Sequence, residues 1–142
     1  MFCEIYMHMK KIISLFTALI SLFAISCTTN VAVDSSVNPI GTYDNLTDDF
    51  TGQIYGTVPQ VFKAANIATR VNFGWQGTGE NSRSDSKRVF RVRTELDNLV
   101  YITMVQLEGG ITEVTIASDN DLMFGQRVFN EIARETRKIT GR

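Results

Sequence analysis

Apolar and polar residues alternate along several short stretches of the chain, and this pattern predicts five β-strands. A period of two places successive side chains on opposite faces of a sheet, so that one face can be buried. The segment Gly77–Ser86 is polar and predicts a hairpin loop, and Asp97-Asn98 and Gly109-Gly110 predict tight turns. The predicted strands cover residues 50–55, 71–75, 87–94, 99–107 and 111–117.

Two other segments have the 3.6-residue period of amphipathic helices. The first begins at Thr57, where Gln60 follows at the spacing of a capping box, and continues to about Arg70. The second begins after the polar run Asp119-Asn120-Asp121, which suits helix capping, and ends before Gly141. Each helix is therefore expected to bury one face.

These elements follow one another in the order β-α-β-β-β-β-α, which predicts the α+β class. If the four later strands form a meander, the strand at 50–55 fits beside the strand at 111–117, and all neighbours are antiparallel. Both helices then cover one face of an antiparallel five-stranded sheet, which makes a two-layer sandwich. Residues 50–142 are expected to form this single globular α+β domain.

Residues 1–26 have the features of a secretory signal peptide. Met9-Lys10-Lys11 is a basic start, and the apolar stretch Ile12–Ile25 follows it. This stretch is short for a permanent transmembrane helix, which needs roughly 20 apolar residues. Glu4 ahead of the basic start does not fit a signal peptide, so Met9, or alternatively Met7, is predicted as the true start.

The predicted signal ends in Ala24-Ile25-Ser26-Cys27, which resembles the lipobox of bacterial lipoproteins, although Leu is commoner than Ala at its first position. The resemblance implies that the signal is cut before Cys27 and that this cysteine is acylated. Thr28 stands where an Asp commonly retains Gram-negative lipoproteins at the inner membrane. The presence of Thr28 at this position therefore implies that the protein is located at the periplasmic face of the outer membrane, if the source is Gram-negative. A plain secreted protein and an uncleaved anchor are the alternatives.

The segment 27–49 is expected to be a flexible tether between the lipid and the domain. It is rich in Thr, Ser, Asn and Asp, and Pro39 and Gly41 interrupt any regular pattern. A flexible coil of this length reaches roughly 25 Å. Such a tether holds the domain away from the membrane surface.

Removal of the signal leaves no histidine, and Cys27 is then the one cysteine, because His8 and Cys3 lie in the removed segment. Catalysis by Cys–His or Ser–His–Asp groups is thereby excluded, and so are zinc or iron sites with His or Cys ligands. We therefore expect no enzyme activity, no cofactor and no metal. The chain has 14 basic and 15 acidic residues, so the basic footprint of a general nucleic-acid binder is also absent.

The most charged stretch is the predicted strand 87–94. Lys87, Arg91 and Arg93 alternate along it and share one face. They suggest a basic stripe that meets anionic headgroups, cell-wall polymer or an acidic partner protein. The alternative is the ordinary solvated face of an antiparallel sheet.

Two further features also have two interpretations. The polar run at 119–121 offers oxygen ligands to calcium, but helix capping explains it more simply. A group of aromatic residues suits either the lining of a ligand cavity or the core of a small domain. These residues are Phe73, Trp75, Tyr101 and Phe129.

The domain also resembles a family of small bacterial lipoproteins that is catalogued only as a domain of unknown function. The residues that carry the resemblance are Gly52 through Phe62 to Ala65, Val100-Tyr101-Ile102, Thr112–Ile116 and Ile132 in the last helix. Before that helix the family tends to have a Gly and an acidic-Gly pair, where this chain has Ser118-Asp119-Asn120-Asp121. The resemblance implies the fold and the lipid anchor, and it implies no activity.

The function expected from these features is that of a membrane-tethered envelope lipoprotein. Its domain is expected to be a non-enzymatic module that binds an envelope protein or a cell-wall component. The alternative is a carrier or sensor of a small ligand, with a cavity between the sheet and the helices.

Overall fold

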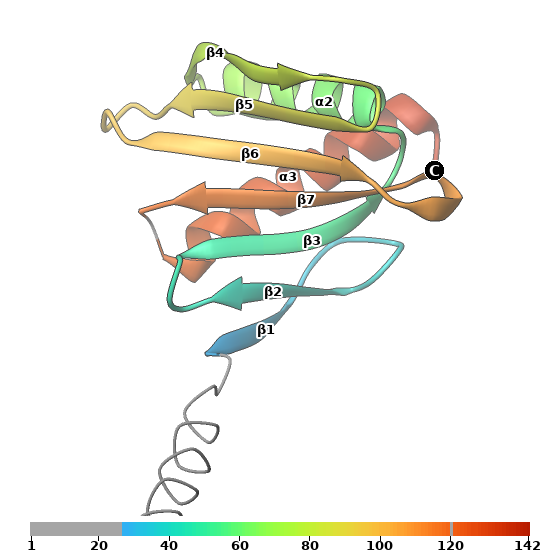
Figure 1. The fold of residues 1–142 in the computed structure, drawn as a ribbon, viewed down its shortest axis with the longest axis horizontal. Coiled ribbons are helices and arrows are strands. Elements are labelled where there is room, and N and C mark those ends of the chain that lie inside the picture. The colour runs from blue at the N-terminus through green and yellow to red at the C-terminus, as the bar shows by residue number, and fades with distance from the viewer. Residues whose placement is uncertain (1–26, 120) are drawn as a thin grey trace, which may run out of the picture.

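A computed structural model describes residues 27–119 and 121–142. The predicted signal peptide and start site lie outside the described residues, and so does Asn120 of the polar run before the last helix. Seven strands form one sheet in which all neighbours are antiparallel. The helices lie together behind this sheet, and the other face of the sheet carries no helix (Figure 1).

The strands follow one another across the sheet in the order β1-β2-β3-β7-β6-β5-β4. Their bounds are Thr28–Ala32 for β1, Ile40–Asp44 for β2, Asp49–Tyr55 for β3, Gln76–Arg83 for β4, Lys87–Arg93 for β5, Leu99–Gln106 for β6 and Ile111–Ser118 for β7. The helical segments are α2 (Val58–Asn66), the π-helical η1 (Ile67–Asn72), the short 3-10 turn η2 (Glu108–Gly110) and α3 (Leu122–Thr140).

The prediction of an α+β fold with an antiparallel sheet and two helices is confirmed, but the sheet has seven strands instead of five and the element order differs. Residues 28–44 form β1 and β2 where a flexible tether was expected. These strands have few apolar residues in the core: Tyr43 is buried and Val31 is partly buried, whereas Thr28, Thr29 and Asn30 are exposed. The apolar alternation is therefore too weak to reveal a strand.

The other correction concerns residues 71–83. The segment 71–75 is not a strand, because the helix continues through η1 and its end is closed by bonds from Phe73 N to Ala68 O and from Trp75 N to Thr69 O. The expected loop at 77–86 instead begins as β4, an edge strand with register shifts at Gly77–Gly79 and Glu80–Ser82. Edge strands with bulges need little apolar sequence, since one side lacks a partner.

Both helix starts follow the predicted capping chemistry. The backbone N–H of Thr57 donates to Gln60 Oε1 at 2.9 Å, which satisfies a donor at the start of α2. At α3 the carboxylate of Asp121 accepts from the N–H of Phe124 at 2.9 Å. The left-handed backbone of Gly141, with φ 73°, ends α3.

The core lies between the sheet and the two helices. Its centre is the contact of Phe50 on β3 with Phe129 on α3, whose ring centroids are 5.6 Å apart. Two glycines make room for these rings: a Cβ at Gly52 would lie 2.5 Å from the ring of Phe129, and a Cβ at Gly125 would lie 2.5 Å from Cβ of Phe50. Helix and sheet can approach this closely only because both positions lack a side chain.

Among the described residues, no helix is both long enough and apolar enough to cross a membrane.

The substitution Gly125→Ala is expected to destabilise the domain by about 1–3 kcal/mol, because the new methyl group meets the Cβ of Phe50 and cannot avoid it by a rotamer change. In an exposed helix the same change stabilises by about 1 kcal/mol. Urea unfolding followed by circular dichroism measures the difference. Met123→Ala at an exposed position of α3 is the control, and an unchanged or raised midpoint for Gly125→Ala would contradict the packing.

Candidate functional site

Cys27 lies at the edge of the domain instead of at the far end of a tether. It is exposed and directly precedes β1. Its carbonyl oxygen accepts from the backbone N–H of Asn45 at 2.9 Å and from Asn45 Nδ2 at 2.5 Å. These bonds fix the entry of the chain to the turn between β2 and β3.

The predicted basic stripe lies on the face of β5 that points away from the helices. Lys87 is exposed there, and Arg91 and Arg93 are partly exposed. Their neighbours Arg88, Phe90 and Val92 are buried on the helix side. Arg93 forms an ion pair with Asp97 at 2.7 Å, so that part of the positive charge of the stripe is balanced within the chain.

The rest of the open face is mainly uncharged and polar. Hydroxyl side chains stand next to one another in a row across four neighbouring strands. The hydroxyls of Thr51 and Thr115 are 3.2 Å apart. The row consists of Thr42, Thr51, Thr115 and Thr103.

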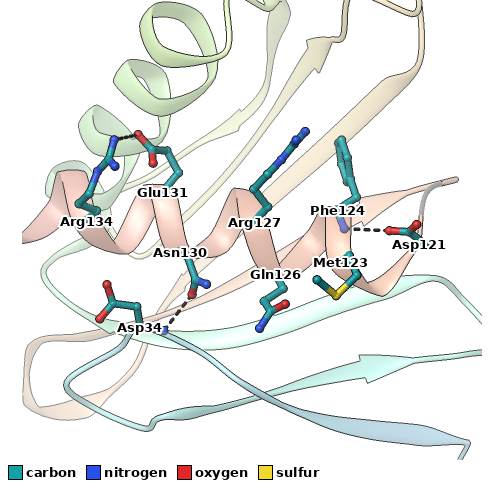
Figure 2. Close-up of a pocket in the computed structure, with 9 residues that line it drawn as sticks. All are labelled: Asp34, Asp121, Met123, Phe124, Gln126, Arg127, Asn130, Glu131 and Arg134. Carbon is teal, nitrogen blue, oxygen red and sulfur yellow. Dashed lines mark hydrogen bonds and ion pairs between the residues drawn. The ribbon is translucent and has the colours of Figure 1, made fainter.

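A groove of about 800 Å³ runs along the outer side of α3 (Figure 2). One helix face supplies most of its lining, and the segment after β1 supplies Asp34. The groove is open to solvent and mixes charged, amide and apolar groups. Its lining consists of Asp34, Asp121, Met123, Phe124, Gln126, Arg127, Asn130, Glu131 and Arg134.

Hydrogen bonds fix the wall of the groove that follows β1. Asp34 forms an ion pair with Arg137 at 2.6 Å, and its backbone N–H donates to Asn130 Oδ1 at 2.9 Å. Gln126 Nε2 donates to the carbonyl oxygen of Ala32 at 2.6 Å. The hydrogen bond from Arg137 holds the pKa of the Asp34 carboxyl below its usual value. The wall is therefore attached to α3 at three points.

Stacked aromatic rings lie at the other side of α3. The centroid of Trp75 is 4.8 Å from that of Phe73 and 5.6 Å from that of Phe124. The guanidinium of Arg127 lies 5.4 Å above the ring of Phe73, an arrangement that attracts the cation to the ring face. Of the aromatic residues considered for a cavity, Trp75 and Phe129 belong to the core, whereas Tyr101 lies on the open face.

A buried carboxylate connects α3 to η1. Glu135 accepts from Lys138 Nζ at 2.7 Å and from Asn72 Nδ2 at 3.1 Å, and the guanidinium of Arg134 is 3.8 Å away. These donors, with Lys138 the strongest, lower the pKa of Glu135 below its ordinary value. Glu131 accepts from Asn72 Nδ2 as well and is ion-paired with Arg134. Both carboxylates thus hold the helices together.

The pKa of Tyr43 moves in the opposite direction. Its hydroxyl donates to Asp48 Oδ1 at 2.7 Å, and this bond raises the pKa of Tyr43 to about 12. The bond ties β2 to the turn that follows it.

The described part of the chain contains no group of three or more His, Cys, Asp or Glu side chains that could hold a metal ion. The aspartates before α3 do not gather ligands from elsewhere, and Asp121 caps the helix. The groove was not anticipated from the sequence, because it depends on how the segment after β1 folds against α3. The helical spacing of Arg127, Glu131 and Arg134 could have indicated this charged face of α3 from the sequence.

No family model matches this chain, and a search of curated proteins found no match either. The resemblance to small lipoproteins therefore remains a prediction from the sequence.

The cluster around Glu135 predicts a pH-dependent stability. Because the pKa of Glu135 is lower in the folded chain than in the unfolded one, its stabilisation is complete above about pH 5 and is lost as the pH falls through the folded pKa. Glu135→Gln is expected to lower the free energy of unfolding at pH 7 by about 1–3 kcal/mol, since charged hydrogen bonds are lost. Urea unfolding at pH 7 and pH 3 measures both effects.

The difference between the wild-type chain and Glu135→Gln should shrink at pH 3. Glu113→Gln on the open face is the control for the loss of one carboxylate. An equal difference at the two pH values would refute the assigned role of the Glu135 charge.

Proposed function

We propose that this chain is a lipid-anchored envelope protein whose domain binds a partner without catalysing a reaction. The observation that carries the proposal is the position of Cys27. The residue is exposed at the edge of the domain, where an acyl group can be attached without disturbing the core. The preceding residues have the lipobox pattern, which implies acylation of Cys27, and this residue directly precedes β1.

The groove along α3 is the partner surface that we propose first. Its walls are attached by hydrogen bonds and ion pairs, so the surface is preformed and loses little freedom on binding. It contains both signs of charge beside Phe124 and Met123, a mixture typical of transient protein interfaces. The basic stripe of Lys87, Arg91 and Arg93 is a second candidate surface, and its charge is reduced by the Arg93–Asp97 pair.

A carrier or sensor of a small ligand is the alternative function. The space between the sheet and the helices is filled by fully buried side chains such as Phe50, Met104 and Phe129. The groove has a volume within the range of small-molecule sites, roughly 300–1,000 Å³, and this supports a polar ligand on the outer side of α3.

The substitution Cys27→Ser tests the anchor. The variant is expected to lack the acyl group and to leave the membrane fraction once the signal is cut, because one residue provides the whole attachment. Fractionation and mass spectrometry of the amino-terminal peptide measure both properties. Thr28→Ser is the control, and a processed Cys27→Ser variant that still sediments with membranes would disprove the anchor.

Photo-crosslinking in intact cells tests the partner surface. A benzoylphenylalanine at position 134 probes the groove, and one at position 87 probes the basic stripe. One at position 108, in η2 between β6 and β7 and outside both sets of residues, is the control. We expect a specific adduct with one envelope protein from position 134. An adduct from position 87 alone would move the interface to the open face, and none from either would leave the ligand-binding alternative.

A further inference from the structure

Several connections of the chain lie at one end of the sheet, on the left in Figure 1. Because the strands are antiparallel, the start of β1 lies at the same end as the β2–β3 turn, the β5–β6 turn and the connection from β7 to α3. This end therefore carries Cys27. We call it the Cys27 end and define it by Cys27, residues 45–48, residues 94–98 and the first turn of α3.

The Cys27 end exposes three large apolar side chains. Leu46 in the β2–β3 turn is 78% exposed, Leu96 in the β5–β6 turn is 83% exposed, and Met123 in the first turn of α3 is 64% exposed. A single exposed leucine needs no explanation, since protein surfaces contain many. Three such side chains at the same end of the sheet as Cys27 indicate a common apolar partner.

The distances at this end suit a flat partner. The β2–β3 and β5–β6 turns are about three strand spacings apart, or roughly 15 Å. Leu46 is held close to Cys27, because Asn45 donates two hydrogen bonds to the Cys27 carbonyl oxygen. The backbone N–H of Leu46 donates to Asp44 Oδ1 at 2.8 Å, which fixes the turn that presents it.

Cys27 directly precedes β1 without a spacer, and this favours the lipid bilayer as the apolar partner. Acyl chains on Cys27 begin at the domain itself, so they bring the neighbouring loops to the headgroup layer. A tether of roughly 25 Å would have allowed any orientation. The short attachment leaves the Cys27 end nearest the bilayer.

The charges of this end favour neutral lipids. Its turns and the adjoining segments carry carboxylates, and Arg93 at the end of β5 is ion-paired with Asp97, so an anionic surface repels this end. The ammonium groups of phosphatidylethanolamine or phosphatidylcholine are suitable counterparts. The carboxylates belong to Asp44, Asp48, Asp49, Glu95, Asp97, Asp119 and Asp121.

We propose that the Cys27 end lies directly on a bilayer of zwitterionic lipid, with Leu46, Leu96 and Met123 inserted between the headgroups. This inference rests on the proposed lipid anchor and adds an orientation to it. The strands then stand on the membrane by their ends. The open sheet face and much of the groove remain accessible from the aqueous side.

The test uses the full-length chain, processed and acylated in cells and then reconstituted into vesicles of phosphatidylcholine and phosphatidylethanolamine. Nitroxide labels are attached at Leu46→Cys and Leu96→Cys in separate variants, since acylated Cys27 has no thiol to label. Ile40→Cys is the matched control, because Ile40 is also apolar and 49% exposed but begins β2 at the opposite end. Accessibility of each label to a water-soluble nickel chelate and to oxygen is measured by electron paramagnetic resonance.

We expect labels at positions 46 and 96 to be several-fold less accessible to nickel than the label at position 40, and more accessible to oxygen. Replacing part of the lipid by phosphatidylglycerol should reduce this protection. Equal nickel accessibility at all three positions, in protein whose acylation mass spectrometry has verified, would overturn the docked orientation and leave the anchor intact. If the amino terminus carries no acyl group, the proposed function fails first, and the docking inference fails with it.

A second variant separates insertion from mere proximity. Leu96→Asp adds a charge at a loop tip that makes no contact with the core, so folding is expected to be unchanged. In acylated protein with the label at position 46, this substitution should raise nickel accessibility, whereas Ile40→Asp should not. No change with Leu96→Asp would show that the loop does not enter the headgroup layer.

Discussion

The close approach of α3 to the centre of the sheet is the contact on which the rest of the structure depends. Phe50 on β3 and Phe129 on α3 each occupy the space where a side chain is missing on the other element, at Gly125 and Gly52. Interiors are close-packed, so this reciprocal fit fixes both the distance and the register of the helix. Every feature on the outer side of α3 takes its position from that register.

The groove illustrates this dependence. With α3 set by the aromatic contact, its opposite face points to solvent, and Asn130 and Arg137 can reach the segment that follows β1. On the other side, Phe124 completes the stack with Trp75 and Phe73. The two sides of α3 are thus contacted by segments that are distant from it in sequence. Both contacts depend on the position of α3 and on the fold of these segments.

The same arrangement relates the groove to Cys27. The N-terminus of α3 lies at the end of the sheet where β1 begins, so Met123 belongs both to the groove lining and to the apolar tips near Cys27. In the proposed lipid-anchored protein, the first turn of α3 is nearest the lipid and its last turn farthest from it. No residue separates Cys27 from β1, so the proposed attachment has no spacer.

The sequence by itself determined the elements with a strong period or strong end signals. The alternation in β5 placed Lys87 and Arg91 on one face and Phe90 on the other, and Thr57 and Asp121 marked the starts of the helices. The α+β class followed from these local signals, since each depends on neighbours within a few residues.

Only the tertiary structure decided the identity of β1, β2 and β4 and the position of the groove. β1 and β4 are the edge strands and β2 lies beside β1, and the strand conformation of all three comes from pairing with the sheet and not from their own pattern. The groove depends on the hydrogen bond between Asp34 and Asn130, and the position of Cys27 depends on its hydrogen bonds with Asn45. Contacts between distant segments carry no local period, which is why the sequence contained the residues of these sites but not their arrangement.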